Sequence, residues 1–259
     1  SKLLACVLLF SGSGIWAEEH KPVSVKVSSE LWLEYTGPNY TGYYFDVLRA
    51  IFTEPDYQLD LEIIPYSMAV KKINSLATDI TLGVYQSDTE GYTSDLPVEL
   101  ESLVAVMSKE QAQRWQGVSS LDGLRVGAMK GYAFSSRLPR SSTYSEHDSI
   151  ASMMRMLKAK RLDVVLEYRA DVEPVLDELK LPFEIKVDIP RKNVYFAFRR
   201  DERGLALKEH FDIEFKRMLE SGELLKLVRA NVSQEEDSFP FDCNESRCFL
   251  KQPDLIKKN

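Results

Sequence analysis

Glu167-Tyr168-Arg169 is a segment whose side chains could hold a polar ligand. It follows a short apolar run, residues 164–166, that is typical of a buried strand. A carboxylate at the end of such a strand needs a partner, because burying an unpaired charge is costly. Two partners fit Glu167, namely a cationic group of a ligand or the nearby Arg169. We take Glu167, Tyr168 and Arg169 as candidate ligand-binding residues.

Aromatic side chains form a second candidate group. Rings at the edge of a crevice can stack on a planar or cationic ligand and still offer a hydroxyl group. Core packing competes with this role at each position, above all at Tyr43 and Tyr44, which adjoin a predicted amphipathic helix. The candidate ligand-binding aromatic residues are Trp32, Tyr35, Tyr66, Tyr85 and Tyr132.

Cys243 and Cys248 are separated by four residues near the end of the chain. In an oxidising compartment such a pair is expected to form a disulfide bond that closes a small loop. A structural zinc site would need four ligands, and no histidine or second cysteine pair lies nearby. The sequence therefore predicts a structural disulfide and no metal site here.

Motifs of catalysis are missing from the predicted mature chain. It has no zinc-binding His-Glu-x-x-His, no phosphate-binding loop and no Gly-x-Ser-x-Gly after a predicted strand. A net charge of −7 disfavours nucleic acids and anionic membranes as partners. We therefore expect a protein without catalytic activity or cofactor, with Glu167 as the one position to test for catalysis.

Two copies of one pattern indicate how these residues are positioned. Residues 70–83 and 153–167 each read as an amphipathic helix, a corner with an aspartate, and a buried strand. The aspartates are Asp79 and Asp163, and an aspartate suits such a turn because its side chain can bond its own backbone. Two copies suggest two α/β lobes whose strand ends face a shared crevice. Chance resemblance between common αβ corners is the alternative.

The start of the chain resembles a signal peptide. Lys2 precedes an apolar stretch, a zone of small residues and a plausible cleavage site after Ala17, before charged residues begin. Cys6 lies in a segment similar to a lipobox, but apolar residues follow it instead of a polar tether. Cleavage after Ala17 and export to the periplasm are the predictions, with a buried N-terminal element as the alternative.

The remaining pattern predicts further elements. Apolar alternation and β-branched runs indicate strands at 23–27, 59–64, 103–107 and 193–198. Helical spacing indicates helices at 46–53, 68–76, 149–160, 209–219 and 224–230, with Gly222 ending the fourth. Polar residues from 233 onward predict an irregular tail.

Several segments resemble the family 3 extracellular solute-binding proteins, the receptors of ABC importers that include polar amino acid binders. Residues 42–51 are similar to the family's Gly-Phe-x-x-Asp-Leu-x-x-Ala-Ile element, and 121–131 to the opening of its second lobe. Residues 76–83 and 157–166 are similar to its corners, with the expected glycine replaced near Ala77 and by Lys160. The resemblance covers about residues 22–230.

The resemblance implies an α/β, two-lobed, type II periplasmic binding protein fold. Each lobe would be a mixed sheet flanked by helices, with hinge strands near residues 104–109 and 190–198. The implied organisation is a signal peptide at 1–17, a first lobe at 18–106, a second lobe at 107–192, a return to the first lobe at 193–232, and a disulfide-bonded tail at 233–259.

The function implied is a monomeric periplasmic receptor that captures a small polar solute for the membrane subunits of an ABC importer. A sensor for a membrane kinase and a dehydratase-like enzyme are alternatives on the same fold. Amino acid binders in the family place an arginine after the first corner, and its guanidinium grips the ligand's carboxylate. Gly91 stands at that position here. A standard α-amino acid would then need Arg137 or Arg169 to supply the charge.

Overall fold

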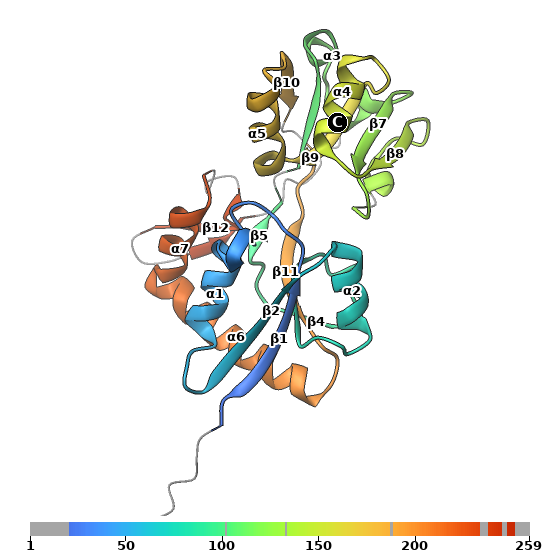
Figure 1. Ribbon diagram of the computed structural model, residues 1–259. Helices are drawn as coiled ribbons and strands as arrows, with labels where there is room; N and C mark the ends of the chain where they lie inside the picture. The colour runs from blue at the N-terminus through green and yellow to red at the C-terminus, as the bar shows by residue number, and fades with distance from the viewer. Residues whose placement is uncertain are drawn as a thin grey trace, which may run out of the picture.

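The computed structural model describes residues 21–251, apart from 102, 133, 187–188, 234–237 and 245–247. Two separate mixed sheets, each flanked by helices, form two lobes that lie one above the other in Figure 1. The predicted signal peptide lies outside the described residues. In the described part of the chain, no helix has the length and apolar character needed to span a membrane.

The first lobe is built on a sheet with strand order β2-β1-β3-β11-β4, and β5 also pairs with β11. Strand β1 runs parallel to β2 and β3, whereas β11 runs antiparallel to β3, β4 and β5. The strands are β1 (Val23–Ser29), β2 (Tyr57–Ile63), β3 (Ile80–Val84), β4 (Tyr92–Thr93), β5 (Glu99–Leu100) and β11 (Asn193–Phe198).

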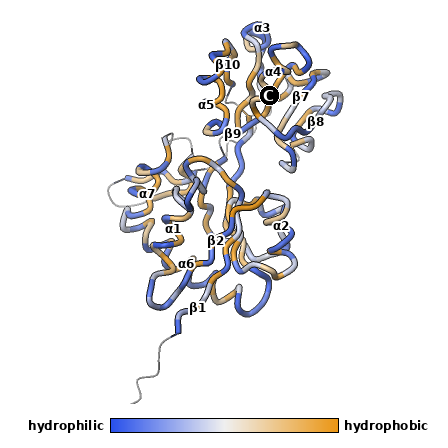
Figure 2. Tube along the Cα trace, viewed as in Figure 1, coloured by the Kyte–Doolittle hydropathy of each residue, from blue (hydrophilic) through white to orange (hydrophobic). Residues whose placement is uncertain are grey.

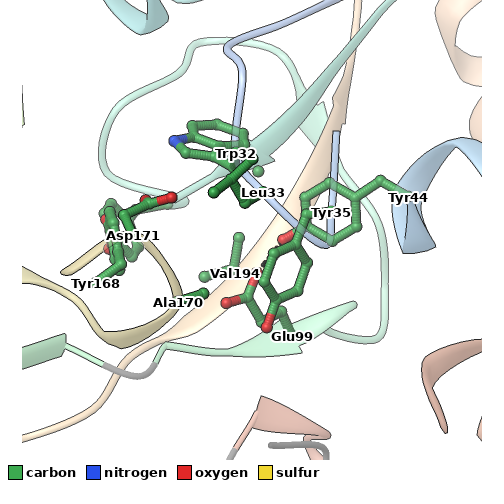
Figure 3. A pocket seen from close by; sticks show the side chains of 11 residues that line it. Trp32, Leu33, Tyr35, Tyr44, Glu99, Tyr168, Ala170, Asp171 and Val194 are labelled. Carbon is green, nitrogen blue, oxygen red and sulfur yellow. Dashed lines mark hydrogen bonds between the residues drawn. The ribbon is translucent and has the colours of Figure 1, made fainter. Parts of the chain in front are cut away.

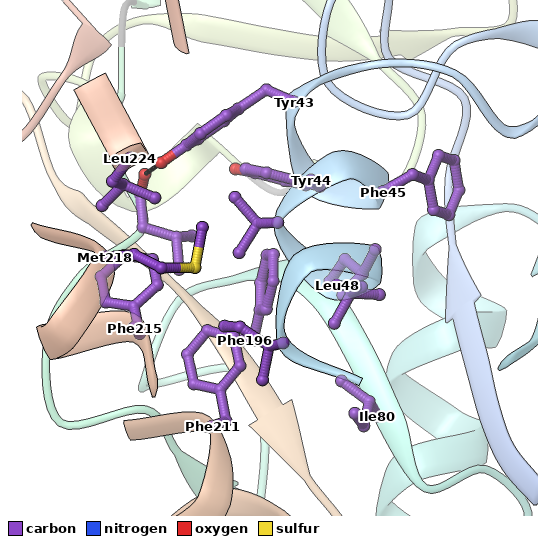
Figure 4. Packing of buried hydrophobic residues seen from close by; sticks show 14 of the residues in the cluster. Tyr43, Tyr44, Phe45, Leu48, Ile80, Phe196, Phe211, Phe215, Met218 and Leu224 are labelled. Atoms are coloured by element: carbon purple, nitrogen blue, oxygen red, sulfur yellow. Dashed lines mark hydrogen bonds between the residues drawn. The ribbon is translucent and has the colours of Figure 1, made fainter. Parts of the chain in front are cut away.

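Helices cover both faces of this sheet. One face packs against α1 (Tyr43–Ile51), α6 (Glu202–Ser221) and α7 (Glu223–Asn231), and the other against α2 (Tyr66–Asn74). Figure 4 shows the larger core, where Tyr44 of α1 packs against Phe196 of β11, and Phe211 and Phe215 of α6 continue the aromatic cluster. A short 3₁₀ helix, Pro38–Tyr40, precedes α1. Figure 2 shows apolar segments on the inner sides of these elements.

The second lobe has the strand order β10-β6-β9-β7-β8. Strand β7 is parallel to β8 and β9, and β6 is antiparallel to β9 and β10. One face packs against α4 (Ile150–Lys158) and α5 (Arg169–Leu179), and the other against α3 (Lys109–Gln113) and the 3₁₀ helices Val118–Leu121 and Phe134–Arg137. The strands are β6 (Leu103–Ser108), β7 (Arg125–Met129), β8 (Thr143–His147), β9 (Val164–Tyr168) and β10 (Phe183–Lys186).

The repeated corners have the same geometry in both lobes. The Asp79 carboxylate accepts the backbone N–H of Lys26 in β1 at 2.9 Å, and the Asp163 carboxylate accepts that of Arg125 in β7 at 2.9 Å. Each aspartate thus ties its corner to the neighbouring parallel strand, and not to its own backbone as expected from turn chemistry. Three residues earlier, Leu76 and Lys160 have φ values of 60° and 55°, the left-handed conformation that glycine adopts most easily.

The two lobes are joined by two stretches of chain. The first stretch passes from β5 to β6 and the second from β10 to β11, so the first lobe contains residues from both ends of the chain. Glu101 N–H donates to the Lys192 carbonyl at 2.8 Å and holds these stretches together. The crossover lies between Leu100 and Leu103, a few residues before the first predicted hinge strand, because β6 belongs wholly to the second sheet.

The tail differs from the irregular segment that we predicted. Strands β12 (Phe241–Cys243) and β13 (Cys248–Leu250) form an antiparallel hairpin, and Phe239 and Phe241 are buried in the core of the first lobe. The predicted disulfide bond joins Cys243 to Cys248 across this hairpin. The sequence prediction missed the burial of these two phenylalanines because most residues of the tail are polar.

Candidate functional site

A cleft lies where the lobes meet, and its empty space together with its solvent-open mouth amounts to about 470 Å³. Figure 3 shows its side chains converging from the loop after β1, from β5 and β11, and from the start of α5. No lysine, arginine or histidine is among the lining residues. The lining residues are Trp32, Leu33, Tyr35, Tyr44, Gly83, Tyr85, Glu99, Tyr168, Ala170, Asp171 and Val194.

The loop after β1 is fixed by its own hydrogen bonds. The Trp32 carbonyl accepts the N–H of Thr36 at 2.9 Å, and the Thr36 hydroxyl accepts the N–H of Trp32 at 3.0 Å. The Trp32 ring lies directly against Gly83, where a Cβ atom would come within 2.4 Å of Cζ3 of the ring. Gly83 also has a φ of 69°. Position 83 therefore requires glycine, because a side chain would collide with the Trp32 ring and because the backbone has a positive φ. The absence of a side chain at Gly83 lets the Trp32 ring occupy its place in the cleft.

Aromatic side chains connect the lobes across the cleft. The Trp32 indole N–H donates to the Tyr132 hydroxyl at 3.2 Å, and the hydroxyls of Tyr85 and Tyr168 are 2.8 Å apart. The Tyr66 ring lies 6.1 Å from the Trp32 ring, between centroids. Five of the predicted aromatic residues and Tyr168 are thus close together, although Tyr66 and Tyr132 lie beside the cleft and do not line it.

Two carboxylic acids line the cleft, and the pKa of each is raised. Burial raises the pKa of Glu99 to about 8, against hydrogen bonds from the Tyr44 and Tyr35 hydroxyls that lower it. Burial also raises the pKa of Asp171 to about 6, although the Leu33 N–H donates to it. Both groups therefore carry protons more readily than exposed carboxylates do.

Two further acids lie behind the cleft wall. Burial and the charge of Asp171 raise the pKa of Glu30 to about 7, although the Tyr66 N–H and the Tyr132 hydroxyl donate to it. Glu167 is fully buried, and burial together with the charges of Asp171 and Glu30 raises its pKa well above the usual value. One carboxyl oxygen of Glu30 and one of Glu167 have no hydrogen-bond partner among the described residues.

The structure places Glu167 and Arg169 apart from each other. The Tyr168 N–H donates to Glu167 at 2.9 Å, whereas the Arg169 guanidinium bonds Glu173 at 3.0 Å, one helical turn along α5. Arg169 is therefore not the partner of Glu167, and neither residue lines the cleft. Tyr168 does line it, on the face of β9 opposite to Glu167, because successive side chains of a strand point to opposite faces.

A buried ion pair at the crossover was not predicted from the sequence. The Arg137 guanidinium contacts the Glu101 carboxylate at 2.5 Å, and the Glu101 side chain is fully buried. The Tyr85 hydroxyl donates to the same carboxylate, and Arg137 lies over the Tyr85 ring at 5.2 Å from its centroid. This network connects Arg137 of the second lobe to the stretch of chain between β5 and β6. No spacing in the sequence relates these three residues.

Ser238, in the tail, also supports the cleft. Its hydroxyl hydrogen-bonds to Tyr35, whose own hydroxyl donates to Glu99. The hairpin that follows is anchored by Phe239 and Phe241 in the first lobe. The tail is therefore part of the packing behind this wall of the cleft.

Gly91, where the family resemblance would place an arginine, does not line the cleft. It lies just before β4, and its N–H donates to the Thr89 hydroxyl at 3.0 Å. A Cβ atom here would come within 2.6 Å of the Phe198 carbonyl oxygen. An arginine introduced at this position would disturb β11, so it cannot simply restore a carboxylate site.

Replacing Gly91 with alanine is expected to lower the free energy of unfolding by about 1–3 kcal/mol, the usual cost of overpacking a tight site. The cause is the close Phe198 carbonyl, which belongs to β11 and cannot rotate away. Urea denaturation of the wild type and Gly91→Ala measures the difference. Equal stability of the two proteins would show that β11 moves freely here.

No protein-family model matches this sequence, and no curated protein matches it. Solved structures match it at TM-scores near 0.65 and low sequence identity. The ligand-binding core of GluR0 with L-glutamate has a TM-score of 0.68 and 14% identity, over 82% of this chain and 98% of that one. An amino acid ABC transporter substrate-binding protein, AbpA from Streptococcus pneumoniae, bound to L-arginine, has a TM-score of 0.64 and 18% identity, over 80% and 94%.

An ancestral arginine-binding protein bound to arginine has a TM-score of 0.66 and 15% identity, over 83% of this chain and 100% of that one. The described lobes thus make up nearly the whole of each of these structures. The predicted two-lobed type II periplasmic binding protein fold is confirmed by these matches and by the two sheets.

Proposed function

We propose that this chain is a periplasmic solute-binding receptor that captures a small polar ligand between its lobes for an ABC importer. The observation that carries the proposal is the cleft, whose walls come from both lobes while only two stretches of chain join them. Residues of the two lobes already meet, at Tyr85 and Tyr168 within the cleft and at Trp32 and Tyr132 beside it. A ligand between such walls contacts both lobes at once.

The fold neighbours support the same role. The names of AbpA and of the ancestral protein describe amino acid binding, and AbpA is named as a transporter component. The disulfide bond in the tail suits an exported protein, because such bonds persist in oxidising compartments. The receptor would be monomeric, with the membrane subunits of the importer as its partners and residues 1–17 as its signal peptide.

Ligand binding is expected to favour the arrangement described above, in which the two lobes meet, over a more open arrangement of the lobes. A ligand that contacts both walls stabilises the closed arrangement over an open one, because its affinity for the two differs. Differential scanning fluorimetry against amino acids, amines, organic acids and sugars identifies compounds that raise the melting temperature. Small-angle scattering with a compound that does so should show a smaller radius of gyration.

A variant and a control keep this test specific. Tyr168→Ala removes a ring and a hydroxyl from the cleft and should abolish both the thermal shift and the compaction. Tyr40→Ala changes a tyrosine that is 39% exposed on the first lobe and should leave both unchanged. A radius of gyration that stays constant at saturating ligand would contradict the receptor proposal, and chemical conversion of the bound compound would indicate an enzyme.

A further inference from the structure

Building on the receptor proposal, we propose that the ligand is a small organic cation that carries no carboxylate. The cleft combines aromatic rings with the acids Glu99 and Asp171, and it lacks any basic side chain among its lining residues. Aromatic rings attract cations through the negative charge on their faces, and carboxyl groups do so once they are ionised. Together they make a site that selects for positive charge.

Two of the lining rings, those of Trp32 and Tyr168, are partly exposed, and Figure 3 shows them beside the same space as Asp171 and Glu99. The rings of Tyr35 and Tyr44 are buried, and their hydroxyls donate to Glu99. The ring of Tyr85 is already occupied, because Arg137 and Lys192 lie over it at 5.2 and 5.3 Å from its centroid. These contacts place two basic side chains of the protein itself against the rim of the cleft.

The two arginine side chains near the cleft are paired with carboxylates, and the Lys192 ammonium lies over the Tyr85 ring. Arg137 bonds the buried Glu101, and Arg169 bonds Glu173. A ligand carboxylate placed in the cleft would therefore face Glu99 and Asp171 without a guanidinium to receive it. Repulsion by these two acids, and the loss of hydration, would oppose the binding of an anionic group.

Buried oxygens behind the wall extend the negative region. Glu30 and Glu167 each keep one carboxyl oxygen without a partner, and the charge of Asp171 raises the pKa of both. Glu167 is completely buried. A cation in the cleft would favour the ionised forms of these acids and supply the positive charge that the surrounding protein does not.

A metal ion fits the cleft less well than an organic cation. Among residues 21–251 that are described, no group of three or more His, Cys, Asp or Glu side chains is placed to hold a metal ion. The two lining acids are accompanied mainly by aromatic and aliphatic side chains, which cover the body of an organic cation and do not ligate metals.

Matched pairs of compounds test the proposal by isothermal titration calorimetry at pH 8. Agmatine and arginine differ only in the carboxylate, choline and 3,3-dimethylbutanol differ in charge, and so do putrescine and 1,4-butanediol. We expect at least one cation without a carboxylate to bind, and to bind at least about tenfold more tightly than its partner compound. Proton release on binding should appear as a dependence of the heat on the buffer.

Two variants connect the binding to the named acids. Asp171→Asn and Glu99→Gln should each weaken cation binding by about tenfold or more, while each variant keeps its melting transition. Asp177→Asn and Glu178→Gln make the same chemical changes at exposed positions of α5, and they should leave the affinity unchanged.

The outcomes separate the ligand class from the receptor role. If arginine binds as tightly as agmatine, or if only neutral or anionic compounds bind and close the lobes, the cation proposal is wrong and the receptor role stands. If none of the three cations binds at millimolar concentration, the cation proposal is likewise wrong. If no compound of any class changes the radius of gyration, the receptor role itself fails.

Discussion

Replacing Arg137 with alanine is expected to lower the free energy of unfolding by about 3–5 kcal/mol, because it leaves a buried carboxylate without its cation. The Glu101 side chain is fully buried and the Arg137 side chain is only 11% exposed. Removing the guanidinium also takes a cation from the Tyr85 and Phe134 rings, 5.2 and 5.1 Å away. Urea denaturation followed by circular dichroism measures the loss.

Arg125→Ala is the matched control. Arg125 forms two hydrogen bonds with Asp163, but 46% of its side chain is exposed to solvent. An exposed ion pair contributes about 1 kcal/mol or less. The double variant Arg137→Ala/Glu101→Gln should recover part of the stability, because it removes the charge left behind. A loss in Arg137→Ala no larger than that in Arg125→Ala would show that water reaches Glu101.

The ligand-free protein is expected to become less stable as the pH rises from 5 to 8.5, by about 2 kcal/mol or more. Glu30, Glu99 and Asp171 have pKa values of about 7, 8 and 6, above their usual values of 4.5, 4.5 and 3.8. A raised pKa in the folded state means that folding favours the protonated acid. The protonated acid contributes its full stabilisation of the folded state at pH values below its pKa in the unfolded chain. This stabilisation is lost as the pH rises through its pKa in the folded protein.

Other acids do not cancel this effect in the same range. Arginine side chains beside Asp79 and Asp163 oppose the effect of burial and lower the pKa of each, so these two lose their contribution only in more acid solution. Glu99→Gln should make the profile less steep, above all between pH 7 and 8.5, because glutamine does not ionise while Glu30 and Asp171 still lose their contributions at lower pH. A flat profile in the wild type would contradict the raised pKa values. A cation ligand should reverse the trend by stabilising the ionised acids.

The sequence predicted the sheets well where strands are buried on both faces. Residues 193–198 were predicted as a strand with the bounds that β11 has, because their apolar and aromatic residues form one continuous run. Helix α5 was missed, although Val172, Val175, Leu176 and Leu179 have helical spacing. Pro174 lies inside it and interrupts the helical pattern, since proline cannot donate the backbone hydrogen bond.

The candidate site could be predicted only in part. The aromatic residues were predicted because they lie in loops between predicted strands and helices, and such loops were expected to border the crevice between the lobes. Asp171 was missed together with α5, and Glu99 belongs to a two-residue strand with no pattern of its own. The pairing of Arg137 with Glu101 joins positions 36 residues apart and depends on how the lobes meet. No local spacing encodes such a contact.

The order of strands has a consequence for how the chain folds as it is made. The second sheet is assembled from one uninterrupted stretch, Leu103 to Lys186, so all its strands are available before β11 exists. The first sheet must wait, because β11 inserts between β3 and β4. Until residues 193–198 appear, one edge of β3 is unpaired and the core positions that face Phe196 are uncovered. A nascent chain that ends before residue 193 therefore has a complete second lobe next to an incomplete first lobe. The unpaired edge of β3 is where a chaperone or another chain would attach.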